Sequence, residues 1–216
     1  INIMAIRKTA KPDMELLDED YAAEDCLLSK KIQVLLAWFS LLVPDMKNEE
    51  EQLLDEALME VYRQFGITYD NESIYADVSK CVLKRMPVLG DLYQILKDNP
   101  RTERIAIILN RFIHGSAQYF NQQDNVDLGN PYTVFDLSDL RNSKLQPLAM
   151  LIVLDFVWDC IKEDCTQRKA VIIDELWQLI GSTATKQSSD FVVDIYRLIR
   201  AYSGAAISAS QNLTDY

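Results

Sequence analysis

The chain has 216 residues, of which 49% are hydrophobic and 25% charged, so it can bury the core of one large domain or of a domain with an appended subdomain. Its formal net charge of −11 would repel a phosphate backbone, and we expect no direct nucleic-acid binding by this chain. The single histidine, His114, excludes multi-histidine metal sites within the sequence, and its place beside Gly115 at the end of an apolar segment favours a structural role over a catalytic triad. The four cysteines form no Cys-x-x-Cys pair, so neither a zinc site nor a disulfide framework is indicated.

The sequence contains no recognisable membrane-spanning segment or signal peptide. The longest apolar run, Ile32–Val43, contains Gln33 and Ser40 and is shorter than the roughly 20 residues that a membrane span needs. No signal peptide is recognisable. The chain begins at Ile1, without a methionine, so we expect it to be a piece of a longer protein.

The first half of the chain is mostly helical in pattern. An apolar strand is expected at Ile1–Ile6, followed by a polar link at 7–20. Apolar residues then recur at helical spacing, which predicts helices at 27–43, 48–65, 74–85, 88–97 and 101–113. These segments together predict an all-α subdomain at residues 22–114.

In the second half, buried strands alternate with helices. The pattern predicts strands at 132–137, 170–175 and 205–210, with helices at 146–161 and 189–202. Strands that alternate with helices are typical of parallel β-α-β units. The predicted fold class is therefore α/β, a parallel sheet with an inserted all-α subdomain, divided into residues 1–21, 22–114 and 115–216.

The segment 170–175, Ala-Val-Ile-Ile-Asp-Glu, is an apolar run that ends in two carboxylates. In open α/β sheets ligands bind at the carboxyl ends of the strands, so Asp174 and Glu175 are expected in that crevice. This is the Walker B arrangement of nucleotide hydrolases, in which Asp174 would help to hold Mg²⁺ and Glu175 would position or deprotonate the attacking water. The alternative is an acid that only caps the following helix.

The last predicted strand ends in Gln211 and Asn212. If this strand lies beside 170–175, the amide of Gln211 emerges in the same crevice as Glu175 and can contact both the γ-phosphate and the attacking water. The alternative is an ordinary polar strand end.

Five segments carry a resemblance to a known family. They are Ile1–Ile6, the stretch from Gly115 to Leu128 with its Asn125-Val126-Asp127-Leu128, Phe135–Leu140, Val171–Ile180, and the run from Arg197 to Asp215. Together they resemble the conjugative-transfer and type IV secretion ATPases of the VirB/TraC/TraE kind, whose motor domains are RecA-like P-loop NTPases. Gln122 replaces a common glycine of that family, Leu176 an alanine, and Leu198 and Ala201 two lysines.

The resemblance implies that ATP is hydrolysed with Mg²⁺ at the subunit interfaces of a homo-oligomeric ring, a hexamer or a dimer that assembles into one. Arg197 and Arg200 would then face the nucleotide of a neighbouring subunit. The alternative, which is at least as well supported by the sequence, is that they are surface arginines on a solvent-exposed helix face. It also implies other secretion-channel components as partners and a cytoplasmic location, peripheral on the inner face of the bacterial cell membrane.

The main departure from the family is the absence of a phosphate-binding loop. No Gly-x-x-x-x-Gly-Lys-Ser/Thr occurs in the sequence, so we expect the isolated chain to be inactive as an ATPase. Two alternatives remain open from the residues. One is a DNA translocase of the FtsK/HerA or coupling-protein type, which shares the RecA-like core. The other is a non-catalytic helical interaction module.

Overall fold

The structure is a computed structural model that describes residues 1–8, 26–79, 81–126, 130–141, 143–181 and 184–209. Contacts among these residues divide the chain into two compact units. The first unit comprises the described residues within Ile1–Ile6, Asp25–Phe39 and Val43–Pro131. The second comprises those within Arg7–Glu24, Ser40–Leu42 and Tyr132–Tyr216.

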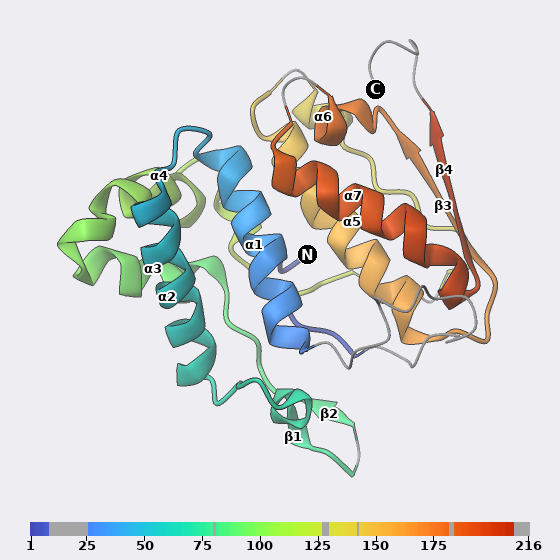
Figure 1. Cartoon of the computed structure of the whole chain (residues 1–216), viewed down its shortest axis with the longest axis horizontal. Helices are drawn as coiled ribbons and strands as arrows, with labels where there is room; N and C mark the ends of the chain where they lie inside the picture. Colours follow the sequence, from blue (N-terminus) through green and yellow to red (C-terminus); the bar gives the residue numbers. More distant parts are fainter. Residues whose placement is uncertain (9–25, 80, 127–129, 142, 182–183, 210–216) are drawn as a thin grey trace. The chain divides into compact units, whose positions relative to one another are not determined.

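Helices form most of the first unit (Figure 1). They are α1 (Leu27–Leu42, whose last turn belongs to the second unit), α2 (Asn48–Gln64), α3 (Leu89–Asp98) and α4 (Glu103–Ile113), with the short 3-10 turn η4 (Pro100–Thr102) before α4. In the core, the buried ring of Trp38 meets the rings of Phe39 and Phe112 edge-on, with centroids 5.1 and 5.3 Å apart. The helices predicted at 27–43, 48–65, 88–97 and 101–113 are confirmed, because each has an apolar face to bury.

The helix predicted at 74–85 is wrong. This stretch forms a 3-10 turn and a small antiparallel hairpin, namely η3 (Asn71–Ile74), β1 (Tyr75–Asp77) and β2 (Val82–Leu83). None of the described residues from 75 to 85 is buried, so a helix here would have had no apolar face to pack. The hairpin is closed by the Lys84 N–H, which donates to the Ile74 carbonyl at 2.8 Å. The predicted all-α subdomain therefore contains a short β-hairpin.

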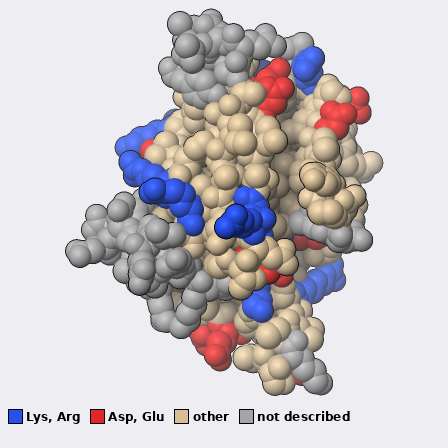
Figure 2. Space-filling view, turned by 90° about the vertical axis from the view of Figure 1, so that its right-hand side faces the viewer, with Lys and Arg blue, Asp and Glu red and all other residues tan. Residues whose placement is uncertain are grey.

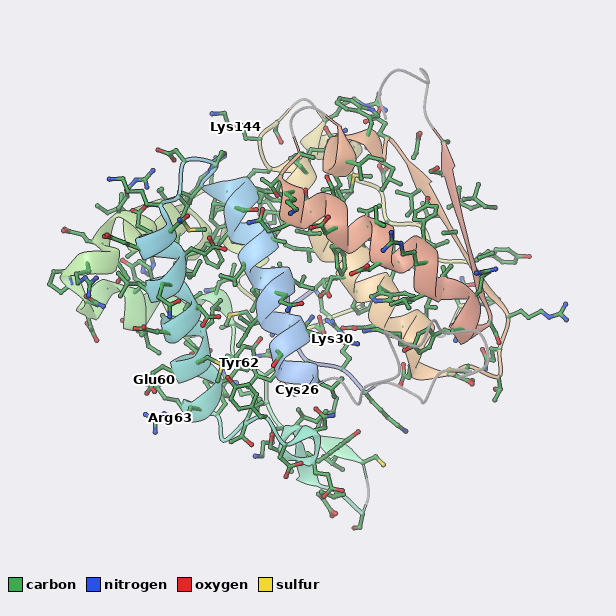
Figure 3. The ribbon with its side chains drawn as sticks, in the orientation of Figure 1. Cys26, Lys30, Glu60, Tyr62, Arg63 and Lys144 are labelled. Carbon is green, nitrogen blue, oxygen red and sulfur yellow. The ribbon has the colours of Figure 1, made fainter. Side chains whose placement is uncertain are left out.

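The strand predicted at 1–6 is also wrong, because these residues form a buried turn within the first unit. The side chain of Asn2 accepts the Met4 N–H at 3.1 Å and donates to the Pro87 carbonyl at 2.8 Å. The hydroxyl of Tyr62 on α2, labelled in Figure 3, donates to the Met4 carbonyl at 2.7 Å. Backbone groups that a strand would offer to a neighbour are bonded to side chains instead.

The second unit contains a parallel β-α-β arrangement. Its elements are α5 (Gln146–Glu163), β3 (Lys169–Asp174), α6 (Trp177–Ile180), α7 (Lys186–Leu198), the 3-10 turn η7 (Ile199–Tyr202) and β4 (Gly204–Ala209). Strands β3 and β4 are parallel, with Lys169 opposite Gly204 and Asp174 opposite Ala209. The helices predicted at 146–161 and 189–202 and the strands predicted at 170–175 and 205–210 are confirmed, apart from Ser210, which lies outside the described residues.

Helices α5 and α7 lie on one side of the β3–β4 pair (Figure 1). The alternation along β3 turns Ile173 toward them and leaves Ile172 73% exposed on the opposite face, beside the 52% exposed Ile207 of β4. Figure 2 shows this side of the molecule, where uncharged residues cover most of the visible surface and basic and acidic side chains are scattered among them. Only one face of the strand pair is covered within the described residues, so burial alternates along β3 and along the first four residues of β4, while the last three residues of β4 are all exposed.

The strand predicted at 132–137 is wrong, since its residues lie in no strand of the structure. Tyr132 and Val134 are 87% and 88% exposed, while the Phe135 ring packs edge-on against that of Phe156 at 6.0 Å. Among the described residues β3 and β4 pair only with each other, so residues 132–137 are not hydrogen-bonded into this sheet. The parallel sheet is thus smaller than the sequence predicted.

The predicted division at 21/22 and 114/115 stays a prediction. The contacts within the structure place the boundary between the two units after Pro131. The 3-10 turn η5 (Gln118–Phe120) belongs to the first unit because it packs on the helices there, and the ring centroids of Phe120 and Phe112 are 5.5 Å apart. Within the described residues, every helix is too short or too polar to reach across a bilayer.

We expect Gly66→Ala to lower the free energy of unfolding of the chain by about 1 kcal/mol, because Gly66 ends α2 with φ +68°, where a Cβ is strained. Gly66→Asn is the matched control, since asparagine tolerates this backbone region better. Urea unfolding followed by circular dichroism measures both variants. An alanine variant as stable as the asparagine variant would contradict the left-handed cap.

Candidate active site

Asp174 and Glu175 form the turn that connects β3 to α6. The buried Ile173 precedes them, and Asp174 is exposed at the end of the strand. One carboxylate oxygen of Asp174 accepts the Glu175 N–H at 2.9 Å, and the Gln178 N–H donates to the Glu175 carbonyl at 3.2 Å. This turn holds Glu175 at φ +55°, which costs a residue with a side chain about 1–2 kcal/mol. Strain of this kind concentrates at functional sites.

The carboxylate of Glu175 is held by side chains from two helices. Its Oε2 accepts an N–H from the amide of Gln178 at 2.8 Å and another from the amide of Gln146 at 3.2 Å. Gln178, in α6, is only 9% exposed, and Gln146 is the first residue of α5. The Glu175 side chain keeps 27% of its surface exposed, so one part of the carboxylate is fixed while the rest is accessible to solvent.

An arginine lies near the other carboxylate oxygen. A terminal nitrogen of Arg141 is 3.8 Å from Glu175 Oε1, which is an ion pair but too long for a hydrogen bond. Arg141 follows the 3-10 turn η6 (Ser138–Leu140), which begins where Ser138 N–H donates to Asp136 at 2.9 Å. Hydrogen bonds from Ser138 lower the pKa of Asp136, and the charge of Arg141 adds to this effect. The pair with Glu175 is exposed on the arginine side, so it contributes little to stability.

The described residues include no group of three or more histidine, cysteine, aspartate or glutamate side chains that could enclose a metal ion. Asp174 offers a single exposed carboxylate at the end of β3. This donor set does not suit a caged metal. It does suit Mg²⁺, which usually keeps several waters and is held by one or two carboxylates together with phosphates.

Gln211 and Asn212 lie outside the described residues. The strand before them is described, and its last residue, Ala209, is paired with Asp174 at the carboxyl edge of the strand pair. The parallel pairing on which the assignment of Gln211 depended is thus present. Its role as a contact of phosphate and water stays a prediction.

Arg197 and Arg200 lie in the last turn of α7 and in η7, and both are exposed. The same segment buries Ile195 and Ile199, so the two arginines point away from the core of the unit. Within the part of the chain that the structure describes, neither is a partner of the Glu175 carboxylate. Their role toward a neighbouring subunit stays a prediction.

Sequence reasoning did not identify Gln146, Gln178 and Arg141. Gln178 had a usable signal, because a residue three positions after Glu175 lies on the same side of a helical turn. The other two precede Glu175 by 29 and 34 positions in the sequence, and only the fold brings them to it.

Comparison with known proteins gives the family. The family described as TraG P-loop domain matches residues 45–216. The solved structure of VirB4 from Thermoanaerobacter pseudethanolicus superposes with a TM-score of 0.80 and 29% sequence identity, over 100% of this chain and 55% of that one. The chain thus spans just over half the length of that relative. The comparison with curated proteins gives no match.

These findings confirm the resemblance seen in the sequence. The match covers the Asp174–Glu175 turn and most of both units, and it supports a P-loop NTPase fold for a chain whose described sheets are small. The chain belongs to the TraG P-loop domain family, and it is similar in structure to VirB4 of Thermoanaerobacter pseudethanolicus.

Proposed function

We propose that this chain is the central part of the motor domain of an ATPase that energises conjugative DNA transfer or type IV secretion. The observation that carries the proposal is the Asp174–Glu175 turn at the carboxyl end of β3, next to the parallel β4. An accessible carboxylate, fixed by hydrogen bonds at the end of a parallel strand, is the group that water activation requires. Membership of the TraG P-loop domain family supports the nucleotide as its ligand.

In this proposal the two acids have separate roles. Glu175 orients the attacking water and accepts its proton, while Asp174 contributes one ligand to Mg²⁺, directly or through water. The bound Mg²⁺ would neutralise charge on the phosphates. Gln211 would contact the γ-phosphate and the water from the end of the last strand. The cofactors are therefore ATP and Mg²⁺.

We further propose that hydrolysis takes place at the subunit interfaces of a homo-oligomeric ring, with a hexamer as the expected form. The outward position of Arg197 and Arg200 on one helical segment supports a contact with the nucleotide of a neighbouring subunit. Other secretion-channel components and the inner face of the cell membrane, reached from the cytoplasm, are the proposed surroundings. The net charge of −11 supports the absence of direct nucleic-acid binding by this chain.

The match to VirB4 favours this proposal over a DNA translocase of the FtsK/HerA type. A non-catalytic helical interaction module is the remaining alternative. The hydrogen-bonded, left-handed Glu175 argues against it, because a binding module has no need of a strained and accessible carboxylate.

In the full-length protein encoded by the gene, we expect Glu175→Gln to leave ATP binding largely intact and to lower hydrolysis by about 10²–10⁴-fold, because an amide cannot accept the proton of water. Phosphate release under saturating ATP and Mg²⁺ measures the rate. Glu163→Gln, an exposed acid at the end of α5, is the matched control and should retain the wild-type rate. Near-normal turnover of Glu175→Gln would overturn the assignment of the base.

The chain of 216 residues alone should neither bind ATP tightly nor hydrolyse it. Triphosphate affinity in this class comes mainly from the backbone amides and the lysine of the phosphate-binding loop, and that loop is missing from this sequence. Asp174 and Glu175 carry negative charge and would repel a polyphosphate unless a cation stands between them. Calorimetric titration with ATP and Mg²⁺ tests this expectation. Micromolar binding near one-to-one stoichiometry would reveal another phosphate site in these residues.

A further inference from the structure

The two amides on Glu175 converge on a single oxygen. Gln178 and Gln146 both donate to Oε2, at 2.8 and 3.2 Å, whereas the nearest cation, Arg141, is 3.8 Å from Oε1. Hydrogen bonds to an ionised acceptor are stronger than those between neutral groups, and two donors on one oxygen fix the rotation of the carboxylate. Among the described residues, Oε1 accepts no hydrogen bond and so keeps its capacity to accept one from water.

The burial of Gln178 indicates that this geometry is specific. Gln178 is 9% exposed, and its neighbours Leu176 and Leu179 are 2% and 0% exposed. Burying an amide without a hydrogen-bond partner destabilises the folded state. The hydrogen bond from Gln178 to Glu175 satisfies this buried amide and so holds the Gln178 side chain in place. Because α6 is anchored by the two leucines, it presents the Gln178 amide at a fixed position.

The backbone of Glu175 also restricts where its side chain can point. Glu175 has φ +55°, and its N–H and carbonyl are both bonded within the turn. The direction of its Cβ is thus set by the turn, while the rotation of its carboxylate is set by α5 and α6. Amides suit this role because they orient a carboxylate without neutralising its charge.

We propose that Gln178 and Gln146 are positioning residues that hold Oε2 of Glu175 so that Oε1 faces the attacking water. This inference rests on the proposed ATPase function and adds to it the residues that orient the base. Neither glutamine touches the reacting atoms. Each acts through Glu175.

The test is Gln178→Met in the full-length protein, a change that keeps similar volume and removes the donor. We expect kcat to fall by about 10–100-fold, since a displacement of about 1 Å at a reacting group can cost 10²-fold. The Kd for ATP, measured by calorimetry with Mg²⁺, should stay within about twofold of wild type, because the amide contacts Glu175 rather than nucleotide. Gln187→Met, an exposed glutamine on α7, is the control and should change neither value.

A double-mutant cycle separates positioning from a general structural role. In a Glu175→Gln background the base is gone, so Gln178→Met should cause no further loss in the residual rate. Equal losses in both backgrounds would overturn the inference, as would unchanged kcat in Gln178→Met. Where Gln178→Met lowers the melting temperature too far to be assayed, Gln146→Met, at the half-buried start of α5, must give the same kcat loss and the same coupling.

The outcomes distinguish this inference from the proposed function. If Glu175→Gln keeps near-normal turnover, the proposed function fails and the positioning role fails with it. If Glu175→Gln abolishes turnover while both glutamine variants keep wild-type kcat, only the positioning role is overturned.

Discussion

The parallel pairing of β3 with β4 is the constraint on which the site depends. Parallel neighbours need a crossover between them, here α7, and the return into β4 passes through Gly204. A Cβ at Gly204 would lie 2.6 Å from the side chain of Ile199, so only glycine allows η7 and β4 to join this closely. The pairing puts Ala209 beside Asp174, and the carboxyl ends of both strands then share one edge. Glu175 is placed there by the end of β3.

At this edge the carboxylate of Glu175 is held in a fixed position and remains partly exposed to solvent. The Glu175 side chain is 27% exposed and is held by neutral amide donors, and among the described residues its ion-pair partner is Arg141 at 3.8 Å. A close arginine would have neutralised the carboxylate and competed for the oxygen that faces solvent. Amide donors fix the group in space and leave its charge available. The left-handed backbone of Glu175 adds rigidity at a modest cost in stability.

The first unit gives a structural reason for part of the segment that carries the family resemblance. The side chain of Asn121 accepts the Gly90 N–H at 2.8 Å, and Asp124 accepts the Asn2 N–H at 2.6 Å. Gln123 donates to the Met86 carbonyl at 2.8 Å. These polar residues satisfy backbone groups at the start of α3, just before it and in the buried N-terminal turn, which have no partner in a helix or strand.

The sequence by itself determined the local elements that can be recognised from one face of apolar residues. Those are the main helices, the two strands at 169–174 and 204–209, and the acidic turn at Asp174 and Glu175. It misassigned residues 1–6, 74–85 and 132–137, because an apolar or alternating run does not say which neighbour will accept its hydrogen bonds. Only the tertiary structure decided that the amides of Gln146 and Gln178 meet on one oxygen of Glu175. That convergence depends on how α5 and α6 pack, and no local periodicity encodes the distance between side chains of separate elements.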